Sequence, residues 1–217
     1  MSMRRWEKLL DILYPPKCAF CGRLLEDSAV RICDGCVSSL PYTDGKCADA
    51  RFVSRVRAPL YYENDVRQAL LRFKFHSSPY LAETFGGMIA EEVRRDPPMD
   101  FDILSWIPLS RRRKRKRGYD QAELLCRAAG KKLGYPAIST LRKKRDVPAQ
   151  SGLNSAEERR ANISGCYEAI DPNAIRGKRI LLIDDIVTTG STLSEAAKML
   201  LLAGAEEVFA STVATRR

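Results

Sequence analysis

Two hydrophobic patterns alternate along most of the chain. Some segments are short apolar runs, and others have apolar residues at every third or fourth position. The first pattern predicts buried strands and the second predicts amphipathic helices. The predicted strands are 57–62, 101–109, 138–141, 165–170, 179–183 and 207–215, and the predicted helices are 66–73, 81–93, 121–133 and 192–202. Strands that alternate with helices predict an α/β fold with a parallel sheet.

The N-terminal segment has a different pattern. Trp6, Leu9, Leu10 and Leu13 have helical spacing, and two prolines follow at 15 and 16, so we expect a short amphipathic helix that ends there. The helix is expected to cover the neighbouring module; a membrane-surface role is the alternative. Three charged residues interrupt the apolar stretch that a signal peptide needs: Glu7, Lys8 and Asp11. No apolar run approaches the roughly 18 residues of a membrane span, so stable membrane insertion is not expected.

The positive charge of the chain is concentrated in one region. The 217 residues carry a formal net charge of +10, with 45% hydrophobic and 29% charged residues. Residues 111–160 hold sixteen Lys and Arg against five Asp and Glu, a net +11, whereas residues 1–50 hold seven of each. Such a concentrated field favours polyanionic partners: phosphates, nucleic acid or an anionic surface.

Four of the seven cysteines form two C-x2-C pairs, at Cys18, Cys21, Cys33 and Cys36. This spacing is typical of a tetrahedral zinc site, and four thiolates leave no open position for a catalytic water. We therefore predict structural zinc, with disulfides or a redox dithiol as the less favoured alternatives. Cys126 and Cys166 lie in helical and strand-like patterns and are expected to be buried, while Cys47 has no partner pair.

The most informative stretch follows the apolar run 179–183. Two adjacent carboxylates are followed, after two spacer residues, by a hydroxyl-rich turn and then by a helical pattern. The carboxylates and the turn comprise Asp184, Asp185, Thr188, Thr189, Gly190, Ser191 and Thr192. Thr192 and Glu195 have capping-box spacing, which predicts that the helix starts at Thr192. Such a turn can bind phosphate, while the carboxylates can accept hydrogen bonds from sugar hydroxyls or engage a divalent cation. The set predicts a ribose 5-phosphate site; the alternative is a plain helix cap beside a solvated acidic strand end.

This stretch resembles the phosphoribosyl pyrophosphate (PRPP) motif of type I phosphoribosyltransferases. The resemblance implies that Asp184 and Asp185 contact the ribose hydroxyls, that the turn binds the 5-phosphate, and that Mg²⁺ accompanies PRPP. Hypoxanthine–guanine salvage enzymes carry an Asp at the position of Thr188, so salvage of 6-oxopurines is not expected.

A run of cations follows the predicted strand 101–109. It comprises Arg111, Arg112, Arg113, Lys114, Arg115, Lys116 and Arg117, preceded by Leu109 and Ser110 where the phosphoribosyltransferase fold places its pyrophosphate loop. We expect these residues to lie in a loop that binds pyrophosphate or nucleic acid. Seven cations exceed the need of one pyrophosphate, which favours a nucleic-acid strand. The alternative is a solvated charge run. Tyr119 is a candidate stacking platform, with a core role as the alternative.

The polar segment 145–167 is predicted to be either a surface helix and loop or a flap that closes over the ligand. Ser155 and Glu158 have the spacing to cap a short helix within it.

Taken in order, the sequence blocks resemble the ComF family of competence proteins, and its ComFC branch in particular. The blocks are the cysteine pairs, QALLRFKF at 68–75, IPLSRRRKRKRGYDQAELL at 107–125, RDVPAQSGLNSAEERRAN at 145–162 and the PRPP motif. The resemblance implies a zinc module over residues 1–50 and a phosphoribosyltransferase-like domain over residues 51–217. Many members carry two further cysteine pairs where this chain has only Cys47, so a second zinc site is not expected.

The resemblance also implies a cytoplasmic role in natural transformation. Members handle incoming single-stranded DNA together with a ComFA-like helicase and a DNA-processing protein. Two hypotheses follow. The protein binds single-stranded DNA and a PRPP or ribose 5-phosphate ligand, or it is an active phosphoribosyltransferase that uses PRPP, Mg²⁺ and a nitrogen acceptor.

Overall fold

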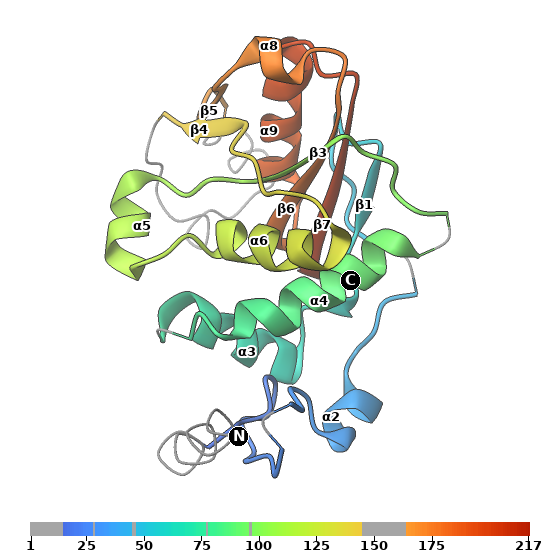
Figure 1. Ribbon diagram of the computed structural model, residues 1–217, viewed down its shortest axis with the longest axis vertical. Coiled ribbons are helices and arrows are strands. Elements are labelled where there is room, and N and C mark those ends of the chain that lie inside the picture. Colours follow the sequence, from blue (N-terminus) through green and yellow to red (C-terminus); the bar gives the residue numbers. More distant parts are fainter. Residues whose placement is uncertain (1–14, 28, 45–46, 77, 96, 145–163) are drawn as a thin grey trace, which may run out of the picture.

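The computed structural model describes residues 15–27, 29–44, 47–76, 78–95, 97–144 and 164–217 (Figure 1). The helix predicted near the N-terminus and most of the predicted flap, with Ser155 and Glu158, lie outside these residues. The helices are α2 (Asp34–Ser39), α3 (Asn64–Phe75), α4 (Leu81–Arg94), α5 (Arg111–Arg117), α6 (Gln121–Leu133), α8 (Pro172–Ile175) and α9 (Ser191–Leu202). The strands are β1 (Arg55–Arg57), β2 (Leu60–Tyr61), β3 (Ile103–Trp106), β4 (Leu141–Lys143), β5 (Tyr167–Ala169), β6 (Arg179–Val187) and β7 (Glu207–Thr215).

The main sheet is parallel, as the alternating pattern predicts. Its order is β1-β7-β6-β3, and β2 also pairs with β7 in parallel. Strands β6 and β7 form the centre, in a register that sets Leu181 opposite Phe209 and Ile183 opposite Ser211. Since all these strands run the same way, their carboxyl ends meet at one edge, which is where ligands bind in open α/β sheets.

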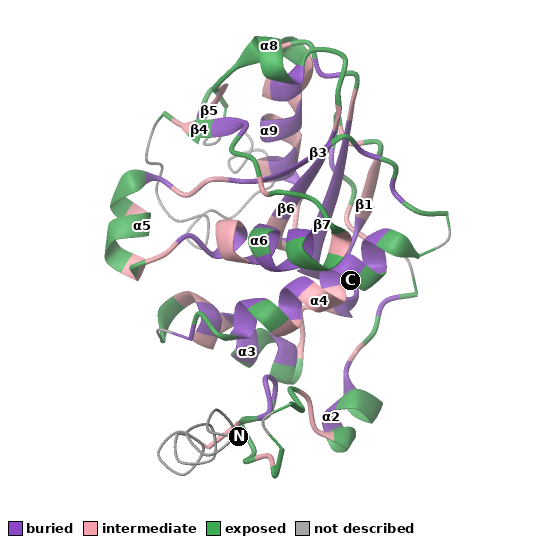
Figure 2. Cartoon of the chain, in the orientation of Figure 1, coloured by how far each residue is buried: buried purple, intermediate pink, exposed green. Residues whose placement is uncertain are grey.

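Helices cover both faces of this sheet. Along β6, Leu181 and Ile183 pack with residues of α4 and α6, whereas Ile180 and Leu182 pack with residues of α9. Figure 2 shows that the central strands and the helix faces turned toward them are buried. Burial on both faces explains why residues 180–183 form a continuous apolar run rather than an alternating pattern.

Two predicted strands lie outside the parallel sheet. β4 and β5 pair with each other in antiparallel fashion, with Leu141 opposite Ala169. The segment before β4 touches the main sheet through one parallel bridge between Ala137 and Leu104. The hydrophobic pattern of a strand indicates which of its residues are buried, but not which strand it pairs with. The sequence therefore could not distinguish these two strands from members of the main sheet.

Helices α4 and α6 approach each other closely at Gly86. A Cβ atom at this position would lie 2.5 Å from the Cβ of Ala128 and 2.8 Å from the backbone nitrogen of Ala129. Only a residue without a side chain allows this packing. Gly87, the next residue, has no atom within 4 Å of its ideal Cβ position.

We predict opposite effects of alanine at these two glycines. Gly86→Ala forces α4 and α6 apart and should destabilise the protein by about 1–3 kcal/mol, as overpacking of cores does. Gly87→Ala makes the same chemical change in open space, and its better helix propensity should stabilise by up to about 1 kcal/mol. Urea unfolding of the two variants measures both effects. Equal changes in midpoint would contradict the close packing.

The cysteine-bearing segment packs against α3 and α4. The ring of Phe20 lies 5.8 Å from that of Phe85, measured between centroids. Arg72 donates hydrogen bonds of 2.9 and 2.6 Å to the carbonyl oxygens of Ala19 and Phe20. Cys18 also belongs to the same hydrophobic cluster as α3 and α4. The segment is therefore coupled to α3 through both apolar contacts and hydrogen bonds.

Candidate functional site

Strand β6 continues past the acidic pair. The sequence predicts that this strand ends at Ile183, but in the structure it runs to Val187, because β7 supplies partners for its last residues. Val187 is only 2% exposed and pairs with Thr215. Asp184 and Asp185 therefore lie within the last four residues of a central strand, at the carboxyl edge of the sheet.

The two carboxylates have unequal surroundings. Burial, together with the adjacent Asp185 carboxylate, raises the pKa of Asp184 to about 8. Its Oδ1 accepts a 2.8 Å hydrogen bond from the backbone N–H of Asp185. The Asp185 carboxylate instead forms a 2.9 Å ion pair with Nζ of Lys74, and both side chains are less than one-fifth exposed. A carboxyl whose pKa is raised thus lies beside one that is ion-paired with a lysine.

Lys74 is a site residue that the sequence analysis missed. It lies in the last turn of α3, more than one hundred positions from its partner in the chain. One signal was present, because Lys74 follows buried Leu70 by four positions and so falls beside the apolar face of the helix. The ammonium group of a lysine at such a position must either form an ion pair or reach the solvent.

The hydroxyl-rich turn lies directly after β6, as predicted, but the helix cap differs. α9 begins at Ser191 with Gly190 in the left-handed conformation before it (φ 65°), and no side chain caps it. The predicted capping box of Thr192 and Glu195 is wrong, since the Glu195 carboxylate accepts a hydrogen bond from the N–H of Gly165 instead. The turn is braced by a 2.9 Å hydrogen bond between the hydroxyls of Thr189 and Ser191.

Gly190 is required for a second reason. A Cβ atom there would lie 2.1 Å from the carbonyl oxygen of Asp49 and 3.0 Å from Cα of Ala50. The next residue, Arg51, donates its N–H to the hydroxyl of Ser194 over 2.8 Å. The linker from the cysteine-bearing segment therefore crosses the turn, a contact that the sequence did not indicate.

The run of cations is a helix and not the predicted loop. The Ser110 hydroxyl accepts a hydrogen bond from the N–H of Arg113, and Gly118 ends α5 in the left-handed conformation (φ 82°). Lys and Arg are good helix formers, and no residue of α5 is buried, so its charges separate into solvent. The cap and the closing glycine were both visible in the sequence.

Asp120 fixes the loop between β3 and α5. This carboxylate is 4% exposed, and it accepts hydrogen bonds from the N–H of Leu109 (2.8 Å) and of Glu123 (3.4 Å). Burial raises the pKa of Asp120, and these hydrogen bonds oppose that rise. The sequence analysis missed this residue, although Asp120 and Glu123 have the spacing of a helix N-terminus.

A cavity of about 670 Å³ lies between this loop, α5 and β4. Of the predicted pyrophosphate or nucleic-acid residues, five line it: Leu109, Ser110, Arg111, Arg112 and Lys114. The opposite wall adds Arg142, Lys143 and Lys144, which the sequence analysis did not single out, and Trp106 contributes an aromatic surface. The structure thus gathers cations from two separate segments around one hollow.

The cavity and the acidic pair are distinct features of the same sheet edge. None of the residues 184–192 lines the cavity. Tyr167 is only 2% exposed, and its pKa is raised by burial and further by the charges of Asp184 and Asp120. Its hydroxyl also accepts a 3.3 Å hydrogen bond from Nζ of Lys143.

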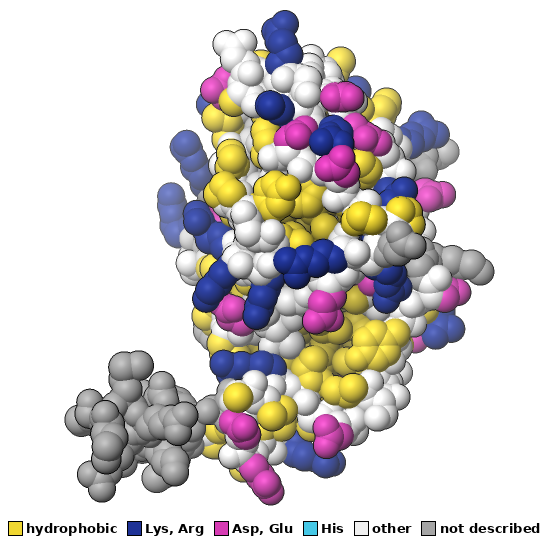
Figure 3. Space-filling view, turned by 45° about the vertical axis from the view of Figure 1, so that its right-hand side comes forward, with side chains coloured by type: hydrophobic (Ala, Val, Ile, Leu, Met, Phe, Trp, Pro, Cys, Tyr) yellow, Lys and Arg dark blue, Asp and Glu magenta, His cyan; other side chains and the backbone are white. Residues whose placement is uncertain are grey.

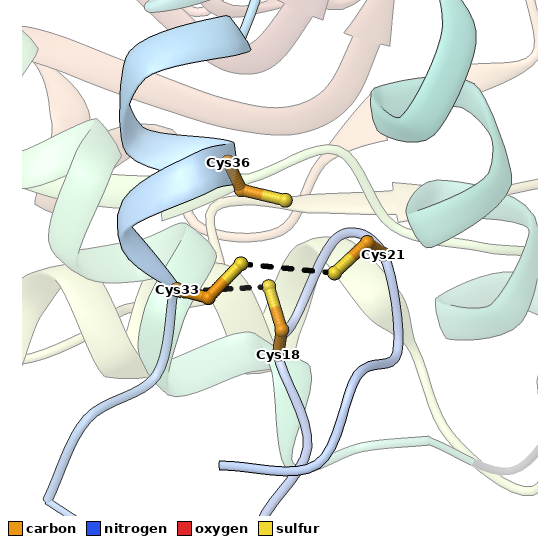
Figure 4. Close-up of side chains that lie close together, drawn as sticks. All are labelled: Cys18, Cys21, Cys33 and Cys36. Atoms are coloured by element: carbon orange, nitrogen blue, oxygen red, sulfur yellow. Dashed lines mark hydrogen bonds between the residues drawn. The ribbon is translucent and has the colours of Figure 1, made fainter.

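The four predicted cysteines form a cluster (Figure 4). Their sulfur atoms point toward one another and lie within 4.8 Å of each other, with Cys18 and Cys21 on one loop and Cys33 and Cys36 at α2. The 3.8 Å between the sulfurs of Cys21 and Cys33 suits two thiolates on one tetrahedral zinc ion. Burial opposes ionisation of Cys18, but backbone N–H groups, that of Cys33 first, lower its pKa to about 6. The donor set fits structural zinc.

Among the described residues, this is the one group of three or more side chains placed to ligate a metal. Cys47 lies outside it, while Cys126 and Cys166 are fully buried, as predicted. Mg²⁺ at Asp184 and Asp185 would need further oxygen ligands from water or from the bound sugar and phosphates.

Tyr119 is half-buried and packs against α3. Its hydroxyl donates to the carbonyl oxygen of Phe73, and the two rings lie 5.9 Å apart between centroids. The core role that the sequence left open describes this residue better.

No helix within the described part of the chain combines the length and hydrophobicity of a membrane span.

Two families match the chain. The family described as "Phosphoribosyl transferase domain" matches residues 122–217, and "Double zinc ribbon domain" matches residues 9–50. The chain is 30% identical over 197 residues to "Competence protein ComFC" of Streptococcus pneumoniae, covering 88% of this chain and 84% of that protein. It is 29% identical over 199 residues to "Competence protein F" of Haemophilus influenzae, covering 89% and 82%. It is also 30% identical over 141 residues to "DNA utilization protein YhgH" of Escherichia coli O157:H7, covering 63% and 61%.

Proposed function

Because the chain belongs to the ComFC family of competence proteins, we propose that it handles single-stranded DNA during natural transformation. A pocket at the end of β6 binds ribose 5-phosphate, and a basic surface made by α5 and the cavity beside it binds the DNA strand. The zinc module takes residues 1–50 and the phosphoribosyltransferase-like domain takes residues 51–217. The observation that carries the proposal is the presence of both features at one edge of one sheet.

In the pocket, the acids and the turn have separate tasks. Asp184 and Asp185 accept hydrogen bonds from ribose hydroxyls, and the hydroxyls and N–H groups of residues 188–192 bind the 5-phosphate. The N-terminus of a twelve-residue helix favours this negative charge. PRPP or a related ribose 5-phosphate carries sugar hydroxyls for the two acids at one end and a phosphate for the turn at the other.

On the basic surface, cations outnumber the needs of a small ligand. Arg111, Arg112, Arg115 and Lys116 are exposed, and the cavity adds three more cations from 142–144. Figure 3 shows several Lys and Arg side chains gathered along its left-hand side, whereas elsewhere on the drawn face they are spread among acidic and hydrophobic ones. A flexible strand with one phosphate per nucleotide matches several cations in a row better than a compact anion does.

A second candidate function is phosphoribosyl transfer from PRPP. The loop of Leu109 and Ser110, fixed by Asp120, borders the cavity on the side of α5, where cations could stabilise pyrophosphate as it leaves. Asp184 and Asp185 would hold Mg²⁺ with oxygens of PRPP, and the metal would neutralise charge on the leaving group. Release of pyrophosphate with a nitrogen nucleophile would identify this activity.

We predict that neutralising α5 lowers the salt dependence of DNA binding. Each phosphate contact to a single strand contributes about 0.7 to the slope of log affinity against log salt. The triple change Arg112→Gln, Arg115→Gln, Lys116→Gln should therefore reduce the slope by about 2 for oligo(dT), as measured by fluorescence anisotropy at several salt concentrations.

The matched control neutralises three exposed lysines away from α5: Lys131, Lys132 and Lys178. This triple change alters the net charge equally and should leave the slope within experimental error. Equal effects of both triples would mean that DNA senses only the total charge, and the assignment to α5 would be wrong.

A further inference from the structure

The last turn of α3 presents an exposed aromatic ring beside the basic helix. Phe75 is 60% exposed, although Phe73 two positions earlier is fully buried. Single exposed apolar side chains are common on protein surfaces, so exposure alone has no functional meaning. The surroundings of this ring distinguish it.

Arg117, the last residue of α5, covers the Phe75 ring. The guanidinium carbon lies 4.9 Å from the ring centroid, within the range of a cation–π interaction. The same guanidinium donates a 2.8 Å hydrogen bond to Oε1 of Gln121, which fixes it in place. Phe75 is therefore held next to the row of cations, with much of its surface still open to solvent.

The same turn also reaches the acidic pocket. Lys74, the preceding residue, forms the ion pair with Asp185. Two adjacent residues of α3 thus contact the two features of the proposed function, the basic helix and the acidic pair.

We propose that Phe75 is a base-stacking platform for single-stranded DNA whose phosphates lie on α5. The proposal rests on the proposed function and adds the element that holds the bases. Every nucleobase has a face that can stack on an aromatic ring, so such a platform binds a strand without reading its sequence. Arg117 serves twice, because it covers one part of the ring and offers charge to a neighbouring phosphate.

The charge of the surroundings favours this occupant over a second copy of the chain. All seven residues of α5 are cationic, and the chain carries a net +10, so two copies would repel each other at this surface. A polyanion with aromatic groups complements both the cations and the ring.

The experiment compares two single-stranded probes of equal length: oligo(dT), and an abasic oligonucleotide that keeps the sugar–phosphate backbone. Phe75→Ala should weaken binding of oligo(dT) about tenfold, with an unchanged salt slope, and should leave binding of the abasic strand unchanged. Phe75→Trp should restore binding of oligo(dT). Phe52→Ala is the matched control, because Phe52 is 53% exposed on the linker and should have no effect on either probe.

The outcomes separate the platform from the function. If Phe75→Ala binds oligo(dT) like the unchanged protein while the α5 triple change reduces the salt slope, the platform is wrong and the DNA surface stands. Equal weakening of both probes would mean that Phe75 acts only by holding Arg117, which also overturns the platform. If the unchanged protein binds neither probe, the proposed function itself fails.

Discussion

Removal of metal from the four-cysteine cluster is expected to unfold the segment that carries it. Among the residues of this segment that the structure describes, few hydrophobic side chains are buried, chiefly Ala19, Phe20 and Leu40, so we expect the metal to supply much of its folding free energy. Structural zinc contributes about 10–16 kcal/mol of apparent binding free energy in small modules. The double change Cys18→Ser, Cys21→Ser should abolish zinc binding and lower the melting temperature, as metal analysis and calorimetry would measure.

The matched control is Cys47→Ser, because Cys47 is a cysteine of the same region outside the cluster. It should keep one equivalent of zinc. The expectation would be wrong if the double variant retained one equivalent, or if the unchanged protein held far less than one.

Loss of zinc should also destabilise α3. Arg72 is bonded to the backbone of Ala19 and Phe20, so unfolding of the segment removes two hydrogen bonds from this helix and an aromatic contact from the neighbouring α4. α3 carries Lys74 and Phe75. Hydrogen exchange in α3 should therefore rise in the double variant, and DNA and ribose 5-phosphate binding should both weaken.

The sequence predicted best the elements whose pattern is strictly local. The bounds of α6 and β7 were predicted to the residue, because Gly134 closes the helix and the last segment is rich in β-branched and apolar residues, which favour a strand. The two cysteine pairs were equally clear, since tetrahedral coordination imposes their spacing. These features depend on near neighbours in the chain.

The errors and omissions involve contacts between distant segments. Lys74 meets Asp185 only because α3 lies across the end of β6, and Glu195 bonds Gly165 instead of capping its own helix. The crossing of Asp49 over Gly190 likewise depends on the path of the linker. The α5 error is different, since its cap and its closing glycine are local signals. Repulsion between neighbouring like charges costs only a few tenths of a kcal/mol per pair on an exposed helix, which is too little to prevent it from forming.

Replacement of both acids, Asp184→Asn with Asp185→Asn, is expected to weaken ribose 5-phosphate binding at least about a hundredfold. Hydrogen bonds are worth about 0.5–1.5 kcal/mol each between neutral groups and about 1.5–3 kcal/mol each to a charged group, and the double change removes both carboxyl groups. Calorimetric titration with ribose 5-phosphate, and with PRPP in the presence and absence of Mg²⁺, measures the loss. Any pyrophosphate release by the unchanged protein should disappear as well.

The single changes should have opposite effects on stability. Because its pKa in the folded protein is raised to about 8, Asp184 stabilises the fold at low pH, and this contribution is lost as pH rises toward and through 8. The Asp184→Asn variant has no carboxyl to ionise at this position, so it avoids this loss of stability. The stability of the variant relative to that of the unchanged protein should therefore increase with pH between about 4 and 8. Asp185→Asn leaves Lys74 without its carboxylate and should destabilise by about 1–2 kcal/mol at neutral pH.

Thermal melts of the two single variants from pH 5 to 9 therefore separate a binding defect from unfolding. Glu91→Gln, an exposed carboxylate on α4, is the control and should change neither stability nor binding. If the double variant binds ribose 5-phosphate as tightly as the unchanged protein, the assignment of the ribose 5-phosphate site to the end of β6 is wrong. If it loses binding while Asp184→Asn gains stability at high pH, the half-buried Asp184 carboxyl serves the ligand at a cost to the stability of the fold.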